Sequence, residues 1–409
     1  MNKTAQSERK HIAFVGRRNV GKSSLVNRFI GQDLVIVSET PGTTTDPVKK
    51  AMELLPFGPV VLIDTAGIDD VGELGQKRIS KTVQIISEAD FAVLVLESQT
   101  NLSIEERNLI DHFRKLELAF TVVINKSELG INYELIEDLK KLGLNFFNVS
   151  CADNSGIDKF KEKISGLIPS EEELPLVGDL VKPHDIIVLV VPIDLGAPKG
   201  RLIMPQVQTI RESLDVDTIV MVVKDKELRA ALSKLNEKPK LVITDSQAIM
   251  RVNADVPEDI SLTTFSILMA RYKGDLKEYV KGLTRVEELK NGDKVLIAEA
   301  CSHHAQEDDI GKVKIPRWLR LHTKKDLDIT IRNGNDYPEN LSEYKLIVHC
   351  GGCLLTRRSM QQRIKQAKLM DVPIVNYGVL ISYMHGAVPR ALQPFEEAIS
   401  EWNLVNDTL

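Results

Sequence analysis

Cysteines are few in this sequence, and long apolar runs and an N-terminal signal segment are missing. Four cysteines among 409 residues are too few for the disulfide framework of a secreted protein, so we expect a reducing compartment. No apolar run reaches the roughly 18–20 residues of a membrane span. The opening residues, MNKTAQSERK, contain no apolar signal segment. We therefore expect a soluble, cytoplasmic protein without a membrane partner.

A surplus of positive charge is missing too. Lys and Arg number 53 and Asp and Glu number 58, which gives a net charge of -5. Proteins whose main ligand is a nucleic-acid backbone usually carry a basic surplus or stripe. The charge balance therefore argues against a nucleic-acid partner. At roughly 100–200 residues per domain, the length allows two to four domains with their own cores.

What the sequence does contain is an alternation of short Val/Ile/Leu runs with helical patterns. Near-continuous apolar strands separated by helices are typical of a parallel sheet covered on both faces. In the first part of the chain the expected strands are His11–Val15, Val60–Ile63, Phe91–Leu96, Phe120–Ile124 and Phe146–Val149. Residues 168–185 contain three prolines and no helical period, which predicts a linker.

Two shorter units with the same rhythm follow this linker. The expected strands are Ile186–Val191, Thr218–Val223 and Lys240–Thr244 in the second unit, and Lys294–Glu299, Asp328–Ile331, Leu346–His349 and Pro373–Asn376 in the third. The second unit contains no catalytic constellation. We predict an α/β protein in which a P-loop domain (1–170) precedes two smaller α/β domains (180–263 and 264–409) with mainly parallel sheets.

A phosphate-binding motif follows the first expected strand. Residues 16–23, GRRNVGKS, match G-x-x-x-x-G-K-S between a strand and a helix. The glycines allow backbone N–H groups to face a phosphate chain at the positive end of the helix. Lys22 can neutralise the β- and γ-phosphates, and the Ser23 hydroxyl can bind Mg²⁺.

Three more motifs occur in the order typical of GTPases. Asp64-Thr65-Ala66-Gly67 ends a buried strand, Thr44 lies in the switch-like segment PGTTTD (41–46), and residues 125–128, NKSE, resemble the guanine-selecting Asn-Lys-x-Asp. The order of the motifs predicts hydrolysis of GTP with Mg²⁺. The residues expected to act in hydrolysis are Lys22, Ser23, Thr44, Asp64 and Gly67, with Ser23 and Thr44 on Mg²⁺. Those expected to contact the nucleotide are Gly16, Asn19, Val20, Gly21, Lys22, Ser23, Ser24, Asn125, Lys126, Glu128, Ser150 and Cys151.

Several of these positions depart from the usual pattern. Glu128 stands where the guanine motif has Asp, so charge is kept but reach differs. Ser150-Cys151-Ala152 resembles the last loop behind the base, where Cys151 is more simply a packing residue. The residue after Gly67 is Ile68 and not the Gln that orients water in Ras-like switches.

The P-loop with Asn19 and the Thr-rich switch resemble the translation-associated GTPases whose hydrolysis depends on potassium. That resemblance implies that Asn19 helps to hold a K⁺ ion on the phosphates, where the ion supplies the charge of an arginine finger. The other interpretation of Asn19 is simple capping of the loop.

Three of the four cysteines lie in the last third of the chain. Cys301 follows one expected strand, and Cys350 and Cys353 follow another, at the edge where open α/β sheets form ligand crevices. Three thiolates with nearby imidazoles and carboxylates suit either structural zinc or a 4Fe–4S cluster. From the residues alone these two remain open, as do buried free thiols.

The pattern Cys301-x-His303 followed by His349-Cys350-x-x-Cys353, behind a translation-type GTPase domain, resembles the FeFe-hydrogenase maturation GTPases, the F-type maturases. This resemblance implies a homodimer formed by the middle domain, and Cys301, Cys350 and Cys353 on a 4Fe–4S cluster. It also implies a scaffold that receives a diiron precursor from two radical-SAM maturases and delivers it to apo FeFe-hydrogenase. His303 and His349 are the candidates for a fourth iron ligand, in competition with the carboxylates at 307–309, whereas His304 and His385 are expected outside the coordination shell.

Two other interpretations stay open at this point. One is an RNA-directed GTPase of the tRNA-modification or ribosome-assembly kind whose cysteines bind structural zinc, although the net charge of -5 counts against it. The other concerns only the middle unit, which could be a spacer with a core of its own instead of a dimer interface. A cluster-containing redox enzyme is disfavoured, because the sequence has neither Cys-x-x-x-Cys-x-x-Cys nor a dinucleotide fingerprint.

Overall fold

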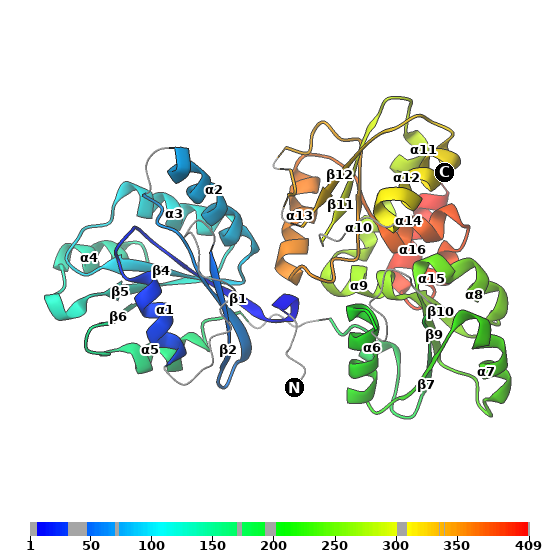
Figure 1. Cartoon of the computed structure of the whole chain (residues 1–409), viewed down its shortest axis with the longest axis horizontal. Helices are drawn as coiled ribbons and strands as arrows, with labels where there is room; N and C mark the ends of the chain where they lie inside the picture. Colours follow the sequence, from blue (N-terminus) through cyan, green and yellow to red (C-terminus); the bar gives the residue numbers. More distant parts are fainter. Residues whose placement is uncertain are drawn as a thin grey trace. The chain divides into compact units, whose positions relative to one another are not determined.

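The computed structural model describes residues 6–31, 47–69, 73–169, 174–192, 202–300, 309–334, 336–338 and 340–407. The chain folds into two compact units, Met1–Glu172 and Glu173–Leu409 (Figure 1). None of the described helices is both long and apolar enough to cross a membrane.

The first unit is built on one six-stranded sheet with the order β2-β3-β1-β4-β5-β6. All neighbours pair in parallel except β2 and β3, which are antiparallel. The strands are β1 (Lys10–Val15), β2 (Val48–Leu54), β3 (Gly58–Asp64), β4 (Phe91–Glu97), β5 (Phe120–Asn125) and β6 (Phe146–Asn148). The helices are α1 (Lys22–Ile30), α2 (Glu73–Glu88), α3 (Ile104–Lys115), α4 (Tyr133–Lys141) and α5 (Ile157–Ile164).

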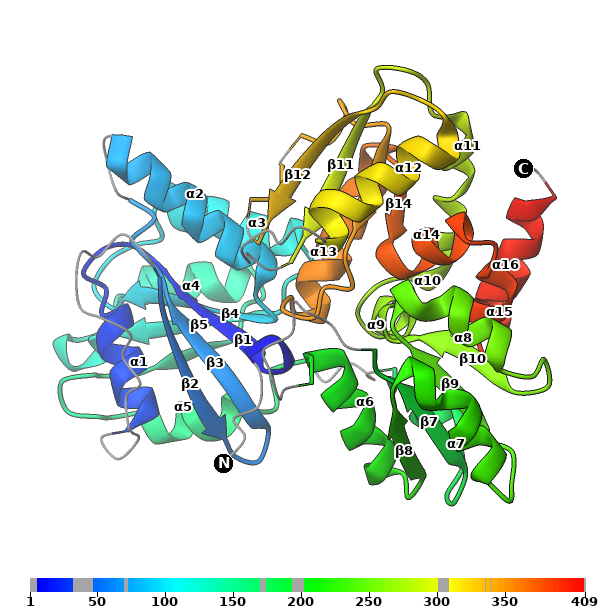
Figure 2. The same cartoon turned by 45° about the vertical axis from the view of Figure 1, so that its right-hand side comes forward.

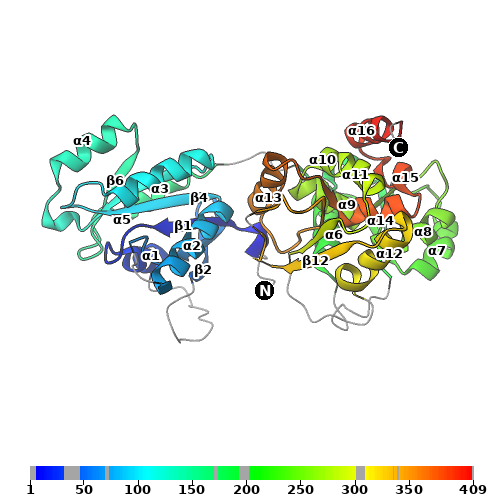
Figure 3. The ribbon, with the colours of Figure 1, turned by 90° about the horizontal axis from the view of Figure 1, so that it is seen from above.

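Helices cover both faces of this sheet (Figure 3). Alternate residues of β1 enter two separate cores, with Ala13 and Val15 in the core under α2, α3 and α4, and Ile12 and Phe14 in the core under α1 and α5. Burial on both faces explains why the strand is a continuous apolar run and not an alternating one. The predicted fold class is confirmed.

The strand β2 was not predicted from the sequence. Its burial alternates, with Met52 and Leu54 buried and the charged residues around them exposed or half-buried. Such a strand carries little apolar signal, because it lies at the edge of the sheet and has one face turned to solvent. The apolar-run criterion that found the buried strands therefore misses it.

The second unit contains two four-stranded sheets whose strands are all parallel, with the orders β10-β9-β7-β8 and β12-β11-β13-β14. The strands are β7 (Ile186–Val190), β8 (Ile219–Val223), β9 (Leu241–Thr244), β10 (Ser261–Thr264), β11 (Lys294–Glu299), β12 (Asp328–Asn333), β13 (Leu346–His349) and β14 (Ile374–Asn376). The helices are α6 (Met204–Asp215), α7 (Leu228–Lys234), α8 (Ile249–Asp255), α9 (Phe265–Lys273), α10 (Leu276–Lys281), α11 (Thr284–Glu288), α12 (Ile315–Thr323), α13 (Arg357–Leu369), α14 (Tyr377–Met384), α15 (Val388–Leu392) and α16 (Glu396–Asn406).

The two sheets of this unit share one contiguous hydrophobic core. Helix α15, the last but one in the chain, packs against β10 of the first of these sheets, and Thr263 donates a hydrogen bond to the carbonyl of Ala391 (Figure 2). The predicted linker also contributes to this core, since Leu176 and Val177 are buried and their N–H groups donate to the carboxylate of Glu212. Part of the segment that the prolines predicted to be a linker is therefore packed into the core of the second unit.

Candidate functional site

The loop between β1 and α1 is shaped by backbone conformations that favour glycine. Gly21 has a φ of 93°, and a Cβ atom there would lie 2.2 Å from Nδ2 of Asn125. A Cβ atom at Gly16 would lie 2.3 Å from the carbonyl oxygen of Val95 on the neighbouring strand. Asn19 is also left-handed, with a φ of 60°, a conformation that Asn tolerates better than most residues. The glycines of the motif are therefore required by close approach as well as by backbone angle.

Lys22 lies over this loop and is buried. Its ammonium group donates to the carbonyl oxygens of Gly16, at 3.0 Å, and Arg17, at 2.8 Å. These bonds hold the side chain along the loop, across the concave side that the motif presents to phosphates. A cation fixed by main-chain acceptors is placed before any nucleotide binds.

Ser23 and Asp64 meet at the end of the loop. The Ser23 hydroxyl donates to Oδ2 of Asp64 at 2.5 Å, while Oδ1 of Asp64 is buried and has no hydrogen-bond partner in the part of the chain described. Burial raises the pKa of Asp64, and the Ser23 bond and the charges of Lys22 and Lys50 oppose this. A hydroxyl and a carboxylate with an unused oxygen fit the hard oxygen ligands that Mg²⁺ prefers.

The segment after Asp64 contacts the phosphate loop. The N–H of Ile68 donates to the carbonyl of Gly16 at 3.3 Å, and Oδ1 of Asp69 accepts the N–H of Arg18 at 2.7 Å. Gly67 packs so closely on Arg18 that a Cβ atom would come within 2.3 Å of the Arg18 Cγ. Ile68 itself is buried in the core under α2 to α4, so its side chain cannot orient water. Thr44 and the rest of the segment 41–46 lie outside the described residues.

A pocket of about 510 Å³ opens beside the start of α1. It is lined by residues from the phosphate loop, α1 and the loops after β5 and β6. Seven of the predicted nucleotide contacts line it, namely Asn19, Gly21, Ser24, Asn125, Lys126, Glu128 and Cys151. The lining also includes Ala152 of the predicted loop behind the base, and two residues that were not predicted from the sequence, Asn27 and Arg28. Arg28 and Asn27 lie one helical turn after Ser24, a spacing that points to the same face of α1.

Asn125 joins the two sides of this pocket. Its Nδ2 donates to the carbonyl of Val20 at 2.8 Å, and its Oδ1 accepts the N–H of Cys151 at 3.3 Å. Ser150 is buried, and its hydroxyl accepts the N–H groups of Ala152 and Asp153, which shapes the loop behind the pocket. Burial raises the pKa of the Cys151 thiol, so this side chain is a neutral lining group and not a reactive thiolate.

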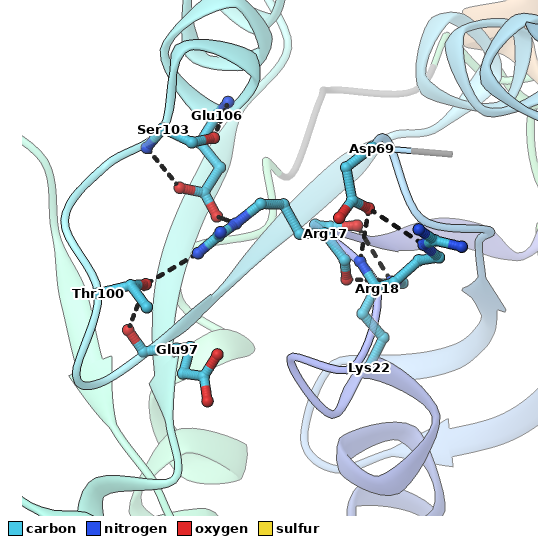
Figure 4. A network of polar contacts seen from close by, with 9 residues as sticks. Arg17, Arg18, Lys22, Asp69, Glu97, Thr100, Ser103 and Glu106 are labelled. Carbon is cyan, nitrogen blue, oxygen red and sulfur yellow. Dashed lines mark hydrogen bonds and ion pairs between the residues drawn. The ribbon is translucent and has the colours of Figure 1, made fainter. Parts of the chain in front are cut away.

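Arg17, which the sequence analysis did not single out, ties the phosphate loop to the start of α3 (Figure 4). Its Nε donates to Glu106 at 2.9 Å and its Nη2 donates to Thr100 at 2.8 Å. Glu106 is only 1% exposed and also closes the capping box with Ser103. The phosphate loop and the α3 N-terminus therefore share one buried carboxylate.

The two predicted cysteine segments begin at neighbouring strands of the C-terminal sheet. Strands β11 and β13 pair in parallel with Ala298 opposite His349, and the N–H of Cys350 donates to the carbonyl of Ala298. The N–H of Ala300 donates to Sγ of Cys350 at 3.0 Å, and that of Gly352 does so at 3.4 Å. Two backbone N–H groups therefore fix the position of this sulfur.

Half of the predicted cluster motif lies outside the described residues, including Cys301, His303, His304 and the carboxylates at 307 and 308. Within the described part, no group of three or more His, Cys, Asp or Glu side chains could hold a metal ion. Two thiols, Cys350 and Cys353, are present and half-buried. Burial raises the pKa of the Cys353 thiol, and the nearby Lys273 ammonium opposes this. Thiols are ligands for soft metals, but the two described here are fewer than a metal site needs.

His349 is fully buried, and both of its ring nitrogens have partners. Nδ1 lies 2.8 Å from the carbonyl oxygen of Cys350, and Nε2 lies 3.0 Å from Nη1 of Arg363. Because guanidinium can only donate, Nε2 accepts and Nδ1 carries the proton. Burial, with the charge of Arg363, lowers the pKa of His349 to about 3. Arg363 also lies over the ring of Tyr337 at 4.6 Å and donates to the carbonyl of Gly334.

Two more residues named in the sequence analysis lie in the described part, the candidate Asp309 and His385, which was expected outside the coordination shell. Asp309 is buried and caps the π-helix Ile310–Lys314, because its Oδ1 accepts the N–H of Lys312 at 2.8 Å. His385 packs edge-on against Trp318, with ring centroids 5.3 Å apart.

Comparison with known proteins finds three matching family models. The 50S ribosome-binding GTPase model matches residues 11–126. The hydrogen maturase F dimerization domain matches residues 176–274, and the hydrogen maturase F tetramerization domain matches residues 277–394.

Curated relatives match the N-terminal part. GTPase Der of Campylobacter hominis is 34% identical over 163 residues, which is 40% of this chain and 35% of that protein. The tRNA modification GTPase MnmE of Streptococcus agalactiae is 33% identical over 156 residues, 38% of this chain and 32% of that protein. The chain thus spans about a third of the length of these relatives.

Among solved structures, Aquifex aeolicus Era bound to GDP.AlF4- aligns with a TM-score of 0.35 and 20% identity, covering 53% of this chain and 94% of that one. The G domain of the T. maritima FeoB iron transporter aligns with a TM-score of 0.32 and 22% identity, covering 40% and 100%. The two maturase models together span more than half of the chain, over both sheets of the second unit, and a GTPase domain precedes them. The chain therefore belongs to the hydrogen maturase F family.

Proposed function

We propose that this chain is a GTP-hydrolysing scaffold that holds a 4Fe–4S cluster and carries a diiron precursor to apo FeFe-hydrogenase. The observation that carries the cluster proposal is the bond from the N–H of Ala300 to Sγ of Cys350. It brings the residue before Cys301 against the sulfur of Cys350, which supports convergence of the three thiols. Family membership supports the scaffold role, with two radical-SAM maturases as the source of the precursor.

Metal analysis of the full chain tests this function. The chain is incubated anaerobically with ferrous iron and sulfide, then desalted, and iron, sulfide and zinc are counted per chain. Equal amounts of iron and sulfide with broad absorbance near 400 nm, a region typical of iron–sulfur charge transfer, are the expected result. A colourless chain with one tightly held zinc would instead identify a structural site, as in the RNA-directed alternative.

The cysteines and His349 have different roles in the proposed cluster site. Cys301, Cys350 and Cys353 supply thiolates, and the cluster supplies a coordination point for the incoming diiron unit. His349 supports Cys350 through its main chain and has no free ring nitrogen for iron. We assign the fourth position to the segment that contains His303, or to a ligand that the cargo displaces.

In the first unit, Lys22 and the N–H of Gly67 would bind the γ-phosphate, and Ser23 and Thr44 would hold Mg²⁺, with Asp64 as a further oxygen donor. The Ser23–Asp64 pair and the unused Asp64 oxygen support this assignment. We place the functional division of the chain at 1–170, 180–263 and 264–409, for hydrolysis, dimerisation and cluster binding. The guanine base would occupy the pocket beside α1, with Glu128 accepting its N–H groups.

Potassium is expected to accelerate hydrolysis through Asn19. Asn19 lines the nucleotide pocket, and an amide oxygen can bind a monovalent ion. Exchange of KCl for NaCl should slow turnover by at least about tenfold, because one fixed positive charge is lost from the transition state. Asn19→Gly keeps the backbone conformation and removes the amide, so this variant should hydrolyse GTP at the same slow rate in both salts. Equal wild-type rates in the two salts would rule out the ion.

The edge strand β8 is expected to form the dimer contact. It pairs with β7 on one side and with no other described strand, and Ile219 and Val222 are 54% and 46% exposed. An apolar open edge is a template for pairing with a second copy. Ile219→Lys should halve the mass seen by sedimentation velocity, whereas Met250→Lys, at an equally exposed apolar site on α8, should leave it unchanged. An Ile219→Lys chain that keeps the wild-type mass would place the contact elsewhere.

A further inference from the structure

A buried lysine ends the helix beneath the cysteine loop. Helix α9 begins directly after β10, where the Thr264 side chain accepts the N–H of Ile267, and it ends at Lys273. The Lys273 side chain is 1% exposed, among the most buried large side chains described. Burying an ammonium group costs free energy unless hydrogen bonds satisfy it. The hydrogen-bond partners of Lys273 therefore indicate its role.

The Lys273 ammonium group donates to the main chain of the cysteine loop. It lies 2.7 Å from the carbonyl oxygen of Leu355, 3.1 Å from that of Cys353 and 3.4 Å from that of Gly352. The same turn is closed by the N–H of Leu355, which donates to Gly352 at 3.0 Å. The segment from Gly352 to Leu355, just before α13, thus folds around the Lys273 ammonium group.

One face of α9 forms the floor of this loop. Ser266, Met269 and Lys273 are spaced i, i+3 and i+7, which places them in line on one side of the helix. A Cβ atom at Gly351 would lie 3.6 Å from Oγ of Ser266 and 3.7 Å from Cβ of Met269. The loop therefore rests on α9 along its whole length, from Gly351 to Leu355.

The opposite wall of the loop is α13, which packs beside α9 (Figures 1 and 2). Gly352 has a φ of 66°, and a Cβ atom there would lie 2.2 Å from Cε of Met360. Helix α13 also holds the end of α9, since Arg357 donates to the carbonyl of Tyr272 and Gln361 donates to that of Gly274. Lys273 is thus fixed at its backbone by one helix and at its ammonium by the loop.

We propose that Lys273 is a positioning residue for the cluster: it sets the turn that carries Cys353 and places a fixed positive charge beside the cluster site. This inference rests on the proposed cluster function. A preformed turn keeps the two sulfurs at one spacing before iron enters. A nearby cation stabilises the more negative, reduced form of an iron–sulfur cluster and so raises its reduction potential.

Three variants of the full chain separate these roles. Lys273→Met removes both charge and donors, Lys273→Gln removes the charge but keeps an amide donor, and Lys281→Met makes the same change at an exposed position of α10. Amide hydrogen exchange of residues 351–355 is measured on the metal-free chain. Iron content and the midpoint potential are then measured after anaerobic incubation with iron and sulfide.

Lys273→Met should exchange these amides faster than Lys281→Met and bind iron about 10–100-fold more weakly, the usual cost of losing a group that supports a metal ligand. Lys273→Gln should retain more iron than the Met variant and show a more negative midpoint potential than wild type. Exchange and iron binding in Lys273→Met that match Lys281→Met, or a wild-type potential in Lys273→Gln, would overturn the proposal.

Two further outcomes distinguish a failure of the Lys273 inference from a failure of the proposed cluster function. If Lys273→Met does not fold, as judged by circular dichroism, the potential of Lys273→Gln decides alone. If the wild-type chain binds no iron, the proposed function fails, and amide exchange in the metal-free variants still decides whether Lys273 sets the turn.

Discussion

Replacing Cys350 by serine is expected to abolish iron binding. The sulfur of this residue accepts N–H groups from Ala300 and Gly352, so it is held at the edge where β11 and β13 end. A hydroxyl keeps the size of the side chain but is a far weaker ligand for iron–sulfur clusters, which are held by thiolates. Because loss of a supporting partner alone costs about 10–100-fold in metal affinity, loss of the ligand should cost at least that much.

The measurement is iron and sulfide per chain after anaerobic reconstitution, beside the GTP hydrolysis rate of the same sample. Cys151→Ser is the matched control, because Cys151 lies in the nucleotide pocket and belongs to the other compact unit. It should bind iron as the wild type does. Full iron content in Cys350→Ser would contradict the cluster assignment, and a similar loss in Cys301→Ser and Cys353→Ser would complete it.

Lys22→Ala should reduce kcat for GTP hydrolysis by about 10²–10³-fold, the usual effect of removing one preorganised charge from a transition state. The ammonium is buried and held by the carbonyls of Gly16 and Arg17, so the charge is in place before the nucleotide binds and costs no reorganisation.

Steady-state phosphate release with excess Mg²⁺ measures this effect. Lys140→Ala provides the matched control, since that lysine is 63% exposed on α4 and only pairs with Glu137. Its rate should equal that of the wild type. Lys22→Ala should also keep its iron, because the two sites lie in different compact units. Wild-type turnover in Lys22→Ala would contradict the assignment of residues 16–23 as the loop that binds the phosphates of GTP.

Much of the nucleotide site was predictable because its chemistry is local. The motif at residues 16–23 predicts the end of a strand before it, a tight turn within it and a helix N-terminus at its last positions. Seven predicted contacts line one pocket because they belong to three short segments whose order along the chain is typical of GTPases. The core strands were equally clear, since burial on both faces makes each a continuous apolar run.

The edge strand β2 and the partners of the motif residues were not predictable in this way. Arg17 and Glu106 are 89 positions apart, and Lys273 and Leu355 are 82 apart. No motif pairs these positions, and Arg17, Glu106 and Lys273 each resemble an ordinary surface charge when taken alone. Their roles depend on which helix packs on which loop.

His349 illustrates the difference most directly. Its place beside Cys350 made it a candidate iron ligand, because sequence proximity cannot say where a ring nitrogen points. Tertiary structure brings Arg363 to Nε2 and turns Nδ1 to the Cys350 carbonyl, so neither nitrogen is free.

The sequence by itself determined the α/β class, the phosphate loop and the presence of a thiol-rich edge, since each depends on spacing along the chain. Tertiary structure alone decided which side chains hold those segments in place, because a buried charge is stable only where distant main-chain and side-chain groups converge to satisfy it.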